Sequence, residues 1–424
     1  MLRNCYRFNL TNVLRCIPVA DTYSFSSQNY GRLYSSSGNI ERRRMSTNII
    51  IDTTSETIVL EEGDMKIQCP FIWLRDNCRC HSCYQETAGQ KLTLLKKLDI
   101  DVYPLNVGMH DDQSINVEWS DAHTSKYPLK LLKDVKFPAS INPLDGLHLR
   151  YWGSEMTRDK IPTFSFHDVM SDESWLYSWL ESLHTHGICI LNGLGDHAGN
   201  LTRLADWVTH PRMTCHGSDF AVKATSEATD LAYTGYPLEL HTDLSYYSYG
   251  PGVQLLHCIQ DSVNGGLSEF ADGFKVAYDL KRDDPETFEI LSTVPVANVY
   301  EGIHSVSKTK YLLRAWKPII RMSNSDHVEN VVFAYSQQDT CMSVEVKDVK
   351  KVYKAMKTFL DSLYSRNNLI SLKLQPGEAI IVNNTRVLHG RTAFEAGGPI
   401  QRHLQGLFLD WDEIYSRMRG MSGK

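Results

Sequence analysis

The order of apolar and polar residues divides the chain into two parts with different predicted elements. From residue 48 onward, short runs combine β-branched residues with alternating polarity, which is typical of strands. These runs are NIIIDTTSETIVLEE, MKIQCPFIWL after a Gly63-Asp64 turn, and INVEWSDAHTSKYPL. They predict a small β-rich domain over residues 47–145.

The rest of the chain mixes helical and strand periods. Helices are predicted at SDESWLYSWLESLHTHG, with Ser171 as N-cap and Gly187 as stop, and at GFKVAYDLKRDDPETFEILSTV and VKDVKKVYKAMKTFLDSLYS. Strands are predicted at ICILNGL, GVQLLHCIQ, ISLKLQPGEAIIVNN and RHLQGLFLDW. The segment HLRYWGSEMTRDKIPTFSF precedes these elements. It is predicted to be a link, because Pro162 and the charges before it argue against a continuous helix. Residues 146–424 therefore predict an α+β fold, a double-sheet jelly roll (double-stranded β-helix) with helical support.

Length and composition exclude several classes of protein. A chain of 424 residues is longer than one hydrophobic core usually supports, which agrees with two domains. Its 42% hydrophobic and 22% charged residues are an ordinary globular balance. A net charge of -6 gives no overall basic field for nucleic acid, and no apolar run is long enough to span a membrane.

Residues 1–46 differ from the rest in composition. They are rich in Arg and Ser, Asp21 is their only acid before Glu41, and MLRNCYRFNLTNVLRC can form a basic amphipathic helix. This pattern predicts a mitochondrial transit segment, with a candidate processing site near Arg32 in GRLYSSSG. The alternatives are a disordered basic tail and a cytoplasmic location.

The tripeptide HTD and a later HGR supply candidate metal ligands. On a strand, side chains two positions apart share a face, so His241 and Asp243 can converge on one ion. His389, expected at a strand's end after the Pro376-Gly377 turn, is the third ligand. Two histidines and a carboxylate leave three open positions, which suit Fe(II), a bidentate oxo acid and dioxygen. An H-x-D tripeptide alone is common by chance, so the hypothesis depends on the whole ordered set.

Arg402 completes that set. It lies in the strand-like RHLQGLF, 13 residues after His389. A dicarboxylic oxo acid that chelates iron at one end leaves a second carboxylate inside the protein, and the guanidinium fork can pair with it through two charge-assisted hydrogen bonds. A lone Arg would otherwise be read as a surface residue.

A cluster of cysteines indicates a second metal. Cys78, Cys80 and Cys83 supply three thiolates, one short of a closed tetrahedral zinc site, and His123 is our choice for the fourth ligand. His81, inside the cluster, is the rival. Such a site would be structural, because it staples a small domain. Reduced cysteines without metal, or the disulfides of a secreted protein, are the alternatives.

Several motifs together resemble the gamma-butyrobetaine dioxygenase and trimethyllysine dioxygenase family of carnitine biosynthesis, the former more closely. They are FIWLRDNCRCHSCY, YWGSE, ELHTD, GPGVQLLHCIQDSVNGG, VLHGR and RHLQGLFLDWD, between Pro70 and Asp412. The resemblance implies a homodimer with an N-terminal zinc domain and a double-stranded β-helix. It implies iron at His241, Asp243 and His389, zinc at Cys78, Cys80, Cys83 and His123, and 2-oxoglutarate at Arg402 with Leu256 and Ser268 nearby. Ascorbate is a candidate reductant.

The residues that match the family's substrate cage depart from its pattern. Family members hold a trimethylammonium group against Tyr and Trp rings by cation–π contact. Tyr233 matches a cage tyrosine, while other positions differ: His216, Phe220, Asp230, Leu244 and Phe408 stand where the family has Tyr, Trp, Asn, Tyr and Tyr, and FAYS at Phe333 replaces an Asn pair. The departures leave the chemistry intact and affect the choice of substrate.

The sequence therefore predicts an Fe(II)- and 2-oxoglutarate-dependent dioxygenase. The expected reaction is hydroxylation of gamma-butyrobetaine to carnitine, with succinate and CO2 as co-products. Trimethyllysine or another small amine or amino acid is the alternative substrate. The rival from a different class is a zinc-stapled binding protein with a vestigial iron site.

Overall fold

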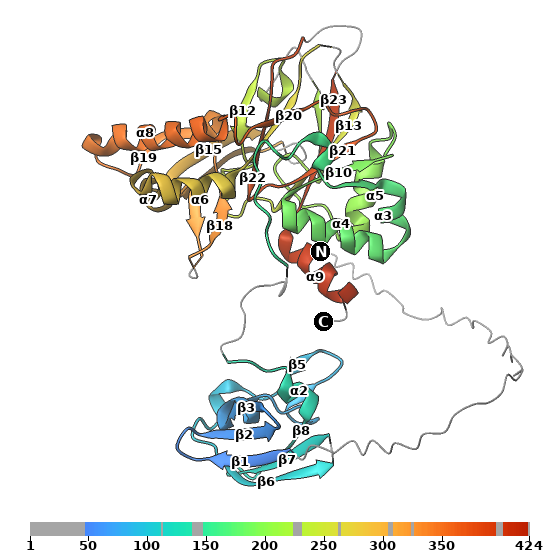
Figure 1. Cartoon of the computed structure of the whole chain (residues 1–424), viewed down its shortest axis with the longest axis vertical. Coiled ribbons are helices and arrows are strands. Elements are labelled where there is room, and N and C mark those ends of the chain that lie inside the picture. Colours follow the sequence, from blue (N-terminus) through green and yellow to red (C-terminus); the bar gives the residue numbers. More distant parts are fainter. Residues whose placement is uncertain are drawn as a thin grey trace, which may run out of the picture. The chain divides into compact units, whose positions relative to one another are not determined.

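The computed structural model describes residues 47–111, 113–137, 147–223, 231–261, 264–303, 308–323, 326–395 and 402–422 (Figure 1). These residues form two compact units on either side of residues 138–146, and each unit is described by itself. The expected transit segment at 1–46 and the expected domain boundary at 145 lie outside the described residues. Within the described ranges, no helix is both long and apolar enough to cross a membrane.

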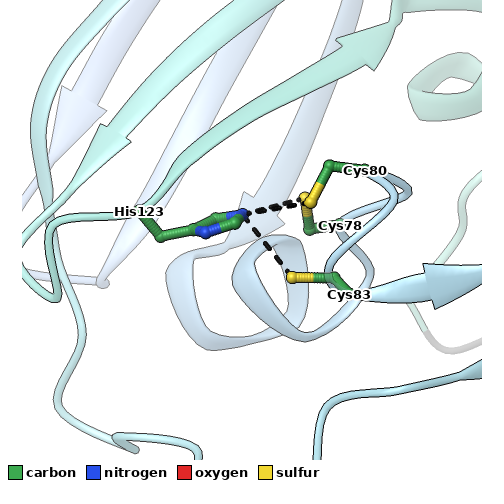
Figure 2. A group of neighbouring side chains, drawn as sticks. All are labelled: Cys78, Cys80, Cys83 and His123. Carbon is green, nitrogen blue, oxygen red and sulfur yellow. Dashed lines mark hydrogen bonds between the residues drawn. The ribbon is translucent and has the colours of Figure 1, made fainter.

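The described part of the N-terminal unit consists of two three-stranded antiparallel sheets, one two-stranded sheet and short helices. The three-stranded sheets are β1 (Asn48–Asp52), β2 (Thr57–Glu62) and β3 (Met65–Pro70), and β6 (Pro104–Asp111), β7 (Ser114–Trp119) and β8 (Thr124–Pro128). Its other elements are α1 (Phe71–Asp76), β4 (Tyr84–Gln85), β5 (Gln90–Lys91), η1 (Leu95–Lys97) and α2 (Leu129–Lys133). Alternating residues such as Ile58 on β2 and Val117 on β7 form its core. The loop after α1 lies against the turn between β7 and β8 (Figure 2).

One predicted strand of this unit is wrong in its second half. MKIQCPFIWL forms a strand only as far as Pro70, and helix α1 follows. Proline has no N–H to continue the strand ladder, and its fixed φ suits the residue that precedes a helix. Phe71, Leu74 and Arg75 are then buried at helical spacing.

The C-terminal unit is built on two sheets. The larger has the order β11 (Asp219–Lys223), β23 (His403–Leu409), β13 (Val253–Gln260), β21 (Ala379–Asn383), β10 (Ile188–Asn192) and β9 (Thr163–Ser165). The smaller has the order β12 (Leu238–His241), β22 (Val387–Arg391), β14 (Ser268–Asp272) and β20 (Ile370–Leu372). All of their pairings are antiparallel except that of β9 with β10. One cavity is lined from both sheets, so the predicted jelly roll with helical support is confirmed.

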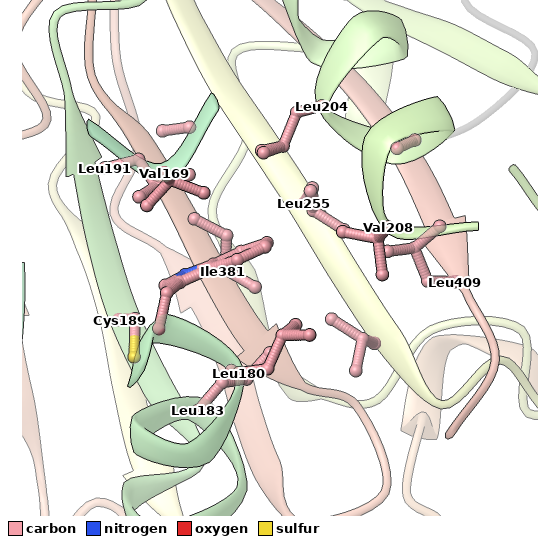
Figure 3. Close-up of a cluster of buried hydrophobic side chains, with 14 of the residues drawn as sticks. Val169, Leu180, Leu183, Cys189, Leu191, Leu204, Val208, Leu255, Ile381 and Leu409 are labelled. Carbon is pink, nitrogen blue, oxygen red and sulfur yellow. The ribbon is translucent and has the colours of Figure 1, made fainter. Parts of the chain in front are cut away.

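Helices cover the outer face of the larger sheet (Figure 3). They are α3 (Phe166–Ser171), α4 (Glu173–His186), α5 (Gly199–Val208) and α9 (Trp411–Ser422), while the short η2 (Arg158–Lys160) precedes β9. Leu180 of α4 and Leu204 of α5 pack in the same core as Leu255 of β13. Because side chains alternate along a strand, Gln254 and Leu256 face the opposite side, where the cavity lies.

A second group of elements packs beside the smaller sheet. They are η3 (Leu231–Tyr233), α6 (Gly273–Asp283), α7 (Pro285–Thr293), β15 (Val296–Ile303), β16 (Lys310–Lys317), β17 (Ile320–Met322), β18 (Val328–Val331), η4 (Tyr335–Gln337), β19 (Gln338–Met342) and α8 (Val346–Leu363). Helices α6, α7 and α8 share one core with Leu240 of β12 and Leu388 of β22.

Two helix predictions need correction at their ends. The stretch expected as one helix at 273–294 is two helices, because Pro285 cannot donate to the preceding turn and Asp284 caps α7 through the Thr287 N–H. The N-cap of α4 is Asp172 rather than Ser171, which ends α3; the predicted stop at Gly187 is confirmed by its left-handed φ of 74°.

Candidate functional site

The two histidines of the predicted iron site come together across a strand pair. Strands β12 and β22 are antiparallel neighbours, and His241 lies directly opposite His389. Their ring centroids are 4.4 Å apart. The sequence predicted His389 at the end of a strand, and this is wrong, because His389 is the central residue of β22. The cross-strand register is what places both imidazoles on one face.

Asp243 joins them from a turn. Strand β12 ends at His241, so the expected shared strand face for His241 and Asp243 is wrong. The turn nevertheless brings Asp243 Oδ1 to 3.3 Å from His241 Nε2 and 3.8 Å from His389 Nε2. Such a set of two imidazoles and one carboxylate, open to a cavity, fits Fe(II).

Neighbouring groups hold these ligands in place. His241 Nδ1 lies 2.7 Å from the Glu239 carbonyl oxygen; with its proton donated there, Nε2 is left for a metal. Gln254 Nε2 donates to Asp243 Oδ2. Asn384 binds the main chain of Asp243 on both sides, accepting from its N–H at 2.8 Å and donating to its carbonyl oxygen at 3.1 Å. Burial lowers the pKa of His389 to about 4, so its imidazole is neutral near pH 7 and can bind a cation.

Gln254 and Asn384 were not foreseen from the sequence. A signal for Gln254 was present, because it is a polar residue between the apolar Val253 and Leu255 of a buried strand. Asn384 gave no such signal, since its role depends on where the turn after β21 meets the turn after β12.

The triad borders a cavity of about 320 Å³ between the sheets. The residues predicted near the oxo acid, Leu256, Ser268 and Arg402, line it. So do five residues predicted for the substrate: His216, Phe220, Tyr233, Leu244 and Phe408. Asp230 lies outside the described residues. One cavity thus brings together the three metal ligands, the three oxo-acid residues and these five substrate residues. Phe333 is not in its lining, although Tyr335 and Ser336 of the same FAYS segment are.

Arg402 is buried with its charge incompletely satisfied. Its side chain is 6% exposed, and its Nε has no hydrogen-bond partner among the described residues. The nearest carboxylate, Asp261, lies 3.8 Å from that Nε and is itself paired with Lys373 at 2.8 Å. Burial outweighs the attraction of Asp261 and lowers the pKa of Arg402 below its ordinary value. A buried cation of this kind fits the carboxylate of a ligand in the cavity.

The predicted zinc ligands also meet in the N-terminal unit (Figure 2). His123 Nε2 lies 3.3, 3.6 and 3.5 Å from the Sγ atoms of Cys78, Cys80 and Cys83. A tetrahedral zinc ion would separate its sulfur and nitrogen ligands by roughly 3.5 Å, as its ordinary bond lengths require. His81, the rival fourth ligand, is exposed and outside this cluster.

An arginine stands beside the cysteine cluster. Arg75 of α1 donates from Nη1 to Cys83 Sγ at 3.5 Å and from Nε to Asp121 at 2.8 Å. Asp121 in turn accepts from the His123 N–H at 3.1 Å. Three thiolates around one divalent ion would carry a net negative charge, which the nearby guanidinium of Arg75 would offset.

Comparison with known proteins identifies both units. Residues 140–408 match the family model "Taurine catabolism dioxygenase TauD, TfdA family", and residues 51–133 match "Gamma-butyrobetaine hydroxylase-like, N-terminal". The gamma-butyrobetaine dioxygenase of Homo sapiens is 34% identical, with 82% of this chain and 90% of that protein covered.

More distant relatives include a second activity. The gamma-butyrobetaine dioxygenase of Pseudomonas sp. is 29% identical over 82% of this chain and 88% of its own. The mitochondrial trimethyllysine dioxygenase of Gallus gallus is 28% identical, covering 85% of each chain. On the family-model match and the similarity to the human protein, the chain belongs to the TauD, TfdA family of 2-oxoglutarate-dependent dioxygenases, together with the gamma-butyrobetaine dioxygenases.

Proposed function

We propose that the chain hydroxylates gamma-butyrobetaine to carnitine, with Fe(II) on His241, Asp243 and His389. The observation that carries this proposal is a single cavity lined by the metal-ligand triad, by a buried arginine and by aromatic rings. The substrate follows the names of the relatives at 34% and 29% identity. When bound, Fe(II) and 2-oxoglutarate supply the oxidation, which consumes O2 and gives succinate, CO2 and the hydroxylated substrate.

The residues around the metal site would bind 2-oxoglutarate, keep the metal ligands oriented and exclude water. Arg402 would pair with the distal carboxylate of 2-oxoglutarate, and Ser268 and Leu256 line the same cavity. Gln254 and Asn384 hold Asp243 in place, so that its carboxylate does not need to reorganise when a metal binds. The apolar walls limit water near the reacting atoms.

Aromatic rings form the substrate side of the cavity. Phe220 and Phe408 stack with centroids 5.2 Å apart. Gly406 permits this, because a Cβ there would lie 2.5 Å from Phe220 Cζ. Glu239 adds a negative charge to the same cavity. Aromatic faces and a carboxylate together suit a methylated ammonium group.

The Arg402→Met variant tests the oxo-acid site. We expect the KM for 2-oxoglutarate to rise by roughly 100-fold or more, because charge-assisted hydrogen bonds are worth about 1.5–3 kcal/mol each. Iron content and the KM of the amine should stay unchanged. The variant should use a 2-oxo acid without the distal carboxylate as well as the unmodified protein does. Arg158→Met is the control, since that partly exposed arginine pairs with Glu378 away from the cavity. A normal KM in Arg402→Met would contradict the assignment.

A substrate panel tests the reaction itself. Succinate release should be stimulated most by gamma-butyrobetaine among a series of trimethylated amines and amino acids. Greater stimulation by trimethyllysine would favour the second candidate, which a relative at 28% identity supports. No stimulation by any amine, despite bound iron, would contradict the proposal and favour a vestigial iron site.

Four further proposals accompany this function. The Cys3His cluster holds a structural zinc ion, as the sulfur–nitrogen distances support.

Residues 1–46 direct the protein to mitochondria, as their composition and the mitochondrial trimethyllysine dioxygenases support. The family resemblance supports a homodimer and ascorbate as a reductant. Import of a fusion of residues 1–46, and light scattering of the purified protein, test the location and the dimer.

A further inference from the structure

A tyrosine that the sequence pattern did not single out lies in the cavity wall. Tyr246 follows Leu244 by two positions in the turn after β12, and both line the cavity with Asp243. The Tyr247 N–H donates to the Leu244 carbonyl oxygen at 3.0 Å, which closes the turn, and Leu244 has a φ of 56°. This left-handed turn is uncommon for leucine and brings side chains 244 and 246 into one cluster.

The ring of Tyr246 is fixed from behind. It stacks on Tyr300 of β15 with centroids 4.7 Å apart and planes 10° apart, and Tyr300 stacks in turn on Tyr311 of β16. The Tyr246 hydroxyl lies 3.1 Å from His216 Nε2, which also borders the cavity. The side chain is 2% exposed, and burial raises the pKa of Tyr246, so the phenol stays neutral. A neutral, immobilised ring presents a negative π-face at little entropic cost.

The position of Tyr246 matters because two neighbouring positions lack the aromatic residues expected in the substrate cage. Leu244 stands where the gamma-butyrobetaine dioxygenases are expected to carry a cage tyrosine, and His216 stands where they are expected to carry another. Tyr246 lies between these two altered positions in the cavity wall, because it is hydrogen-bonded to His216 and packs in one cluster with Leu244.

We propose that Tyr246 supplies the cage ring that Leu244 lacks, and thereby sets the preference of this chain for a methylated ammonium group over a neutral group of the same shape. The inference rests on the proposed function. It assigns a specificity residue and not a reacting group, so Tyr246 should affect binding of the substrate and leave the oxo-acid and metal sites intact.

The test compares gamma-butyrobetaine with the carboxylate in which a tert-butyl group replaces the trimethylammonium group. For the neutral compound, the inhibition constant is measured if it is not hydroxylated. Tyr246→Leu should lower the preference for the cation by roughly 3- to 30-fold, the range of one cation–π contact. Tyr246→Phe keeps the π-face and should keep most of the preference. Tyr278→Leu is the control, because Tyr278 of α6 is also partly buried, contacts another tyrosine ring (Tyr151) and lies outside the cavity lining. Tyr247 is unsuitable, since its own ring contacts that of Tyr246.

Two further experiments separate loss of the Tyr246 ring from loss of folding. Adding Leu244→Tyr to Tyr246→Leu should restore part of the preference. If Tyr246→Leu does not fold, the ring at residue 246 is fluorinated in steps, which weakens its π-face with little change of shape. The preference for the cation should then fall as the number of fluorine atoms rises. Folding is checked by the absorption band of the anaerobic complex with Fe(II) and 2-oxoglutarate.

The two failures are distinguishable. If the unmodified protein does not prefer the cation, the proposed substrate class is wrong. If the unmodified protein prefers it and folded Tyr246→Leu prefers it equally, Tyr246 is not the cage ring, while the proposed function stands.

Discussion

The His389→Ala variant is expected to lose the absorption band that appears when Fe(II) and 2-oxoglutarate are added without oxygen. Iron affinity should fall by more than about 100-fold, because even residues that only support a metal ligand are worth 10- to 100-fold. Succinate formation should fall with it. The remaining pair, His241 and Asp243, offers a single imidazole and one carboxylate, too few to hold the ion in the cavity.

A matched histidine separates loss of iron from loss of structure. His257 of β13 is fully buried and lies 2.8 Å from the Gly195 carbonyl oxygen through Nε2, on the opposite face of the strand from Gln254. His257→Gln should therefore keep the band, even if its melting temperature falls. An unchanged band in His389→Ala would contradict the ligand assignment.

Removal of zinc is expected to unfold the N-terminal unit and to leave the C-terminal unit folded. The cluster ties the loop after α1 to the turn between β7 and β8, in a unit whose buried core is small. Structural zinc contributes about 10–16 kcal/mol of apparent binding free energy in small zinc domains, and that free energy is folding free energy. Cys83→Ser, or a chelator, should raise amide hydrogen exchange throughout residues 47–137 and leave exchange in the C-terminal unit unchanged.

The zinc affinity should also depend on pH in a defined direction. Burial raises the pKa of Cys78 to about 11. Burial is also the largest single influence on Cys80, but hydrogen bonds with Ser82, Cys78 and Cys83 together lower the pKa of Cys80 to about 7. Zinc binds thiolates and so must displace protons, which means that its affinity falls as the pH is lowered. Zinc release measured with a colorimetric chelator between pH 8 and about pH 5 checks this sign.

Cys69→Ala is the control for the cluster. Cys69 is buried in β3 of the same unit and lies outside the metal-binding group. Mass spectrometry of the native protein should find one zinc per chain in Cys69→Ala and none in Cys83→Ser. Full zinc content in Cys83→Ser would contradict the proposed ligand set.

The residues of the candidate site could be predicted from the sequence, but their geometry could not. His241, Asp243 and His389 were chosen as an ordered set of ligand types. The expected strand positions were wrong because the register of β12 against β22 depends on tertiary contacts. Arg402 was predicted from the chemical need for a carboxylate partner, and its burial agrees with that reasoning.

Other features gave weak signals in the sequence. The hairpin of β15 and β16 was not predicted, since charged residues in KYLLRAWK obscure its alternation. Tyr246 could not be singled out from the sequence, because only the turn after β12 decides which of Tyr246 and Tyr247 enters the cavity. Periodicity describes strands and helices well and says little about the direction of side chains in turns.

The opposition of His241 and His389 on adjacent strands ties metal binding to strand register. A slip of β22 by one residue would place Leu388 or Gly390 opposite His241, and the imidazole of His389 would point to the other face of the sheet. Only the native pairing then offers both nitrogens to one ion. Iron would thus stabilise the correct alignment against its nearest competitors, and a chain that folds without iron has one fewer constraint on how these two strands pair.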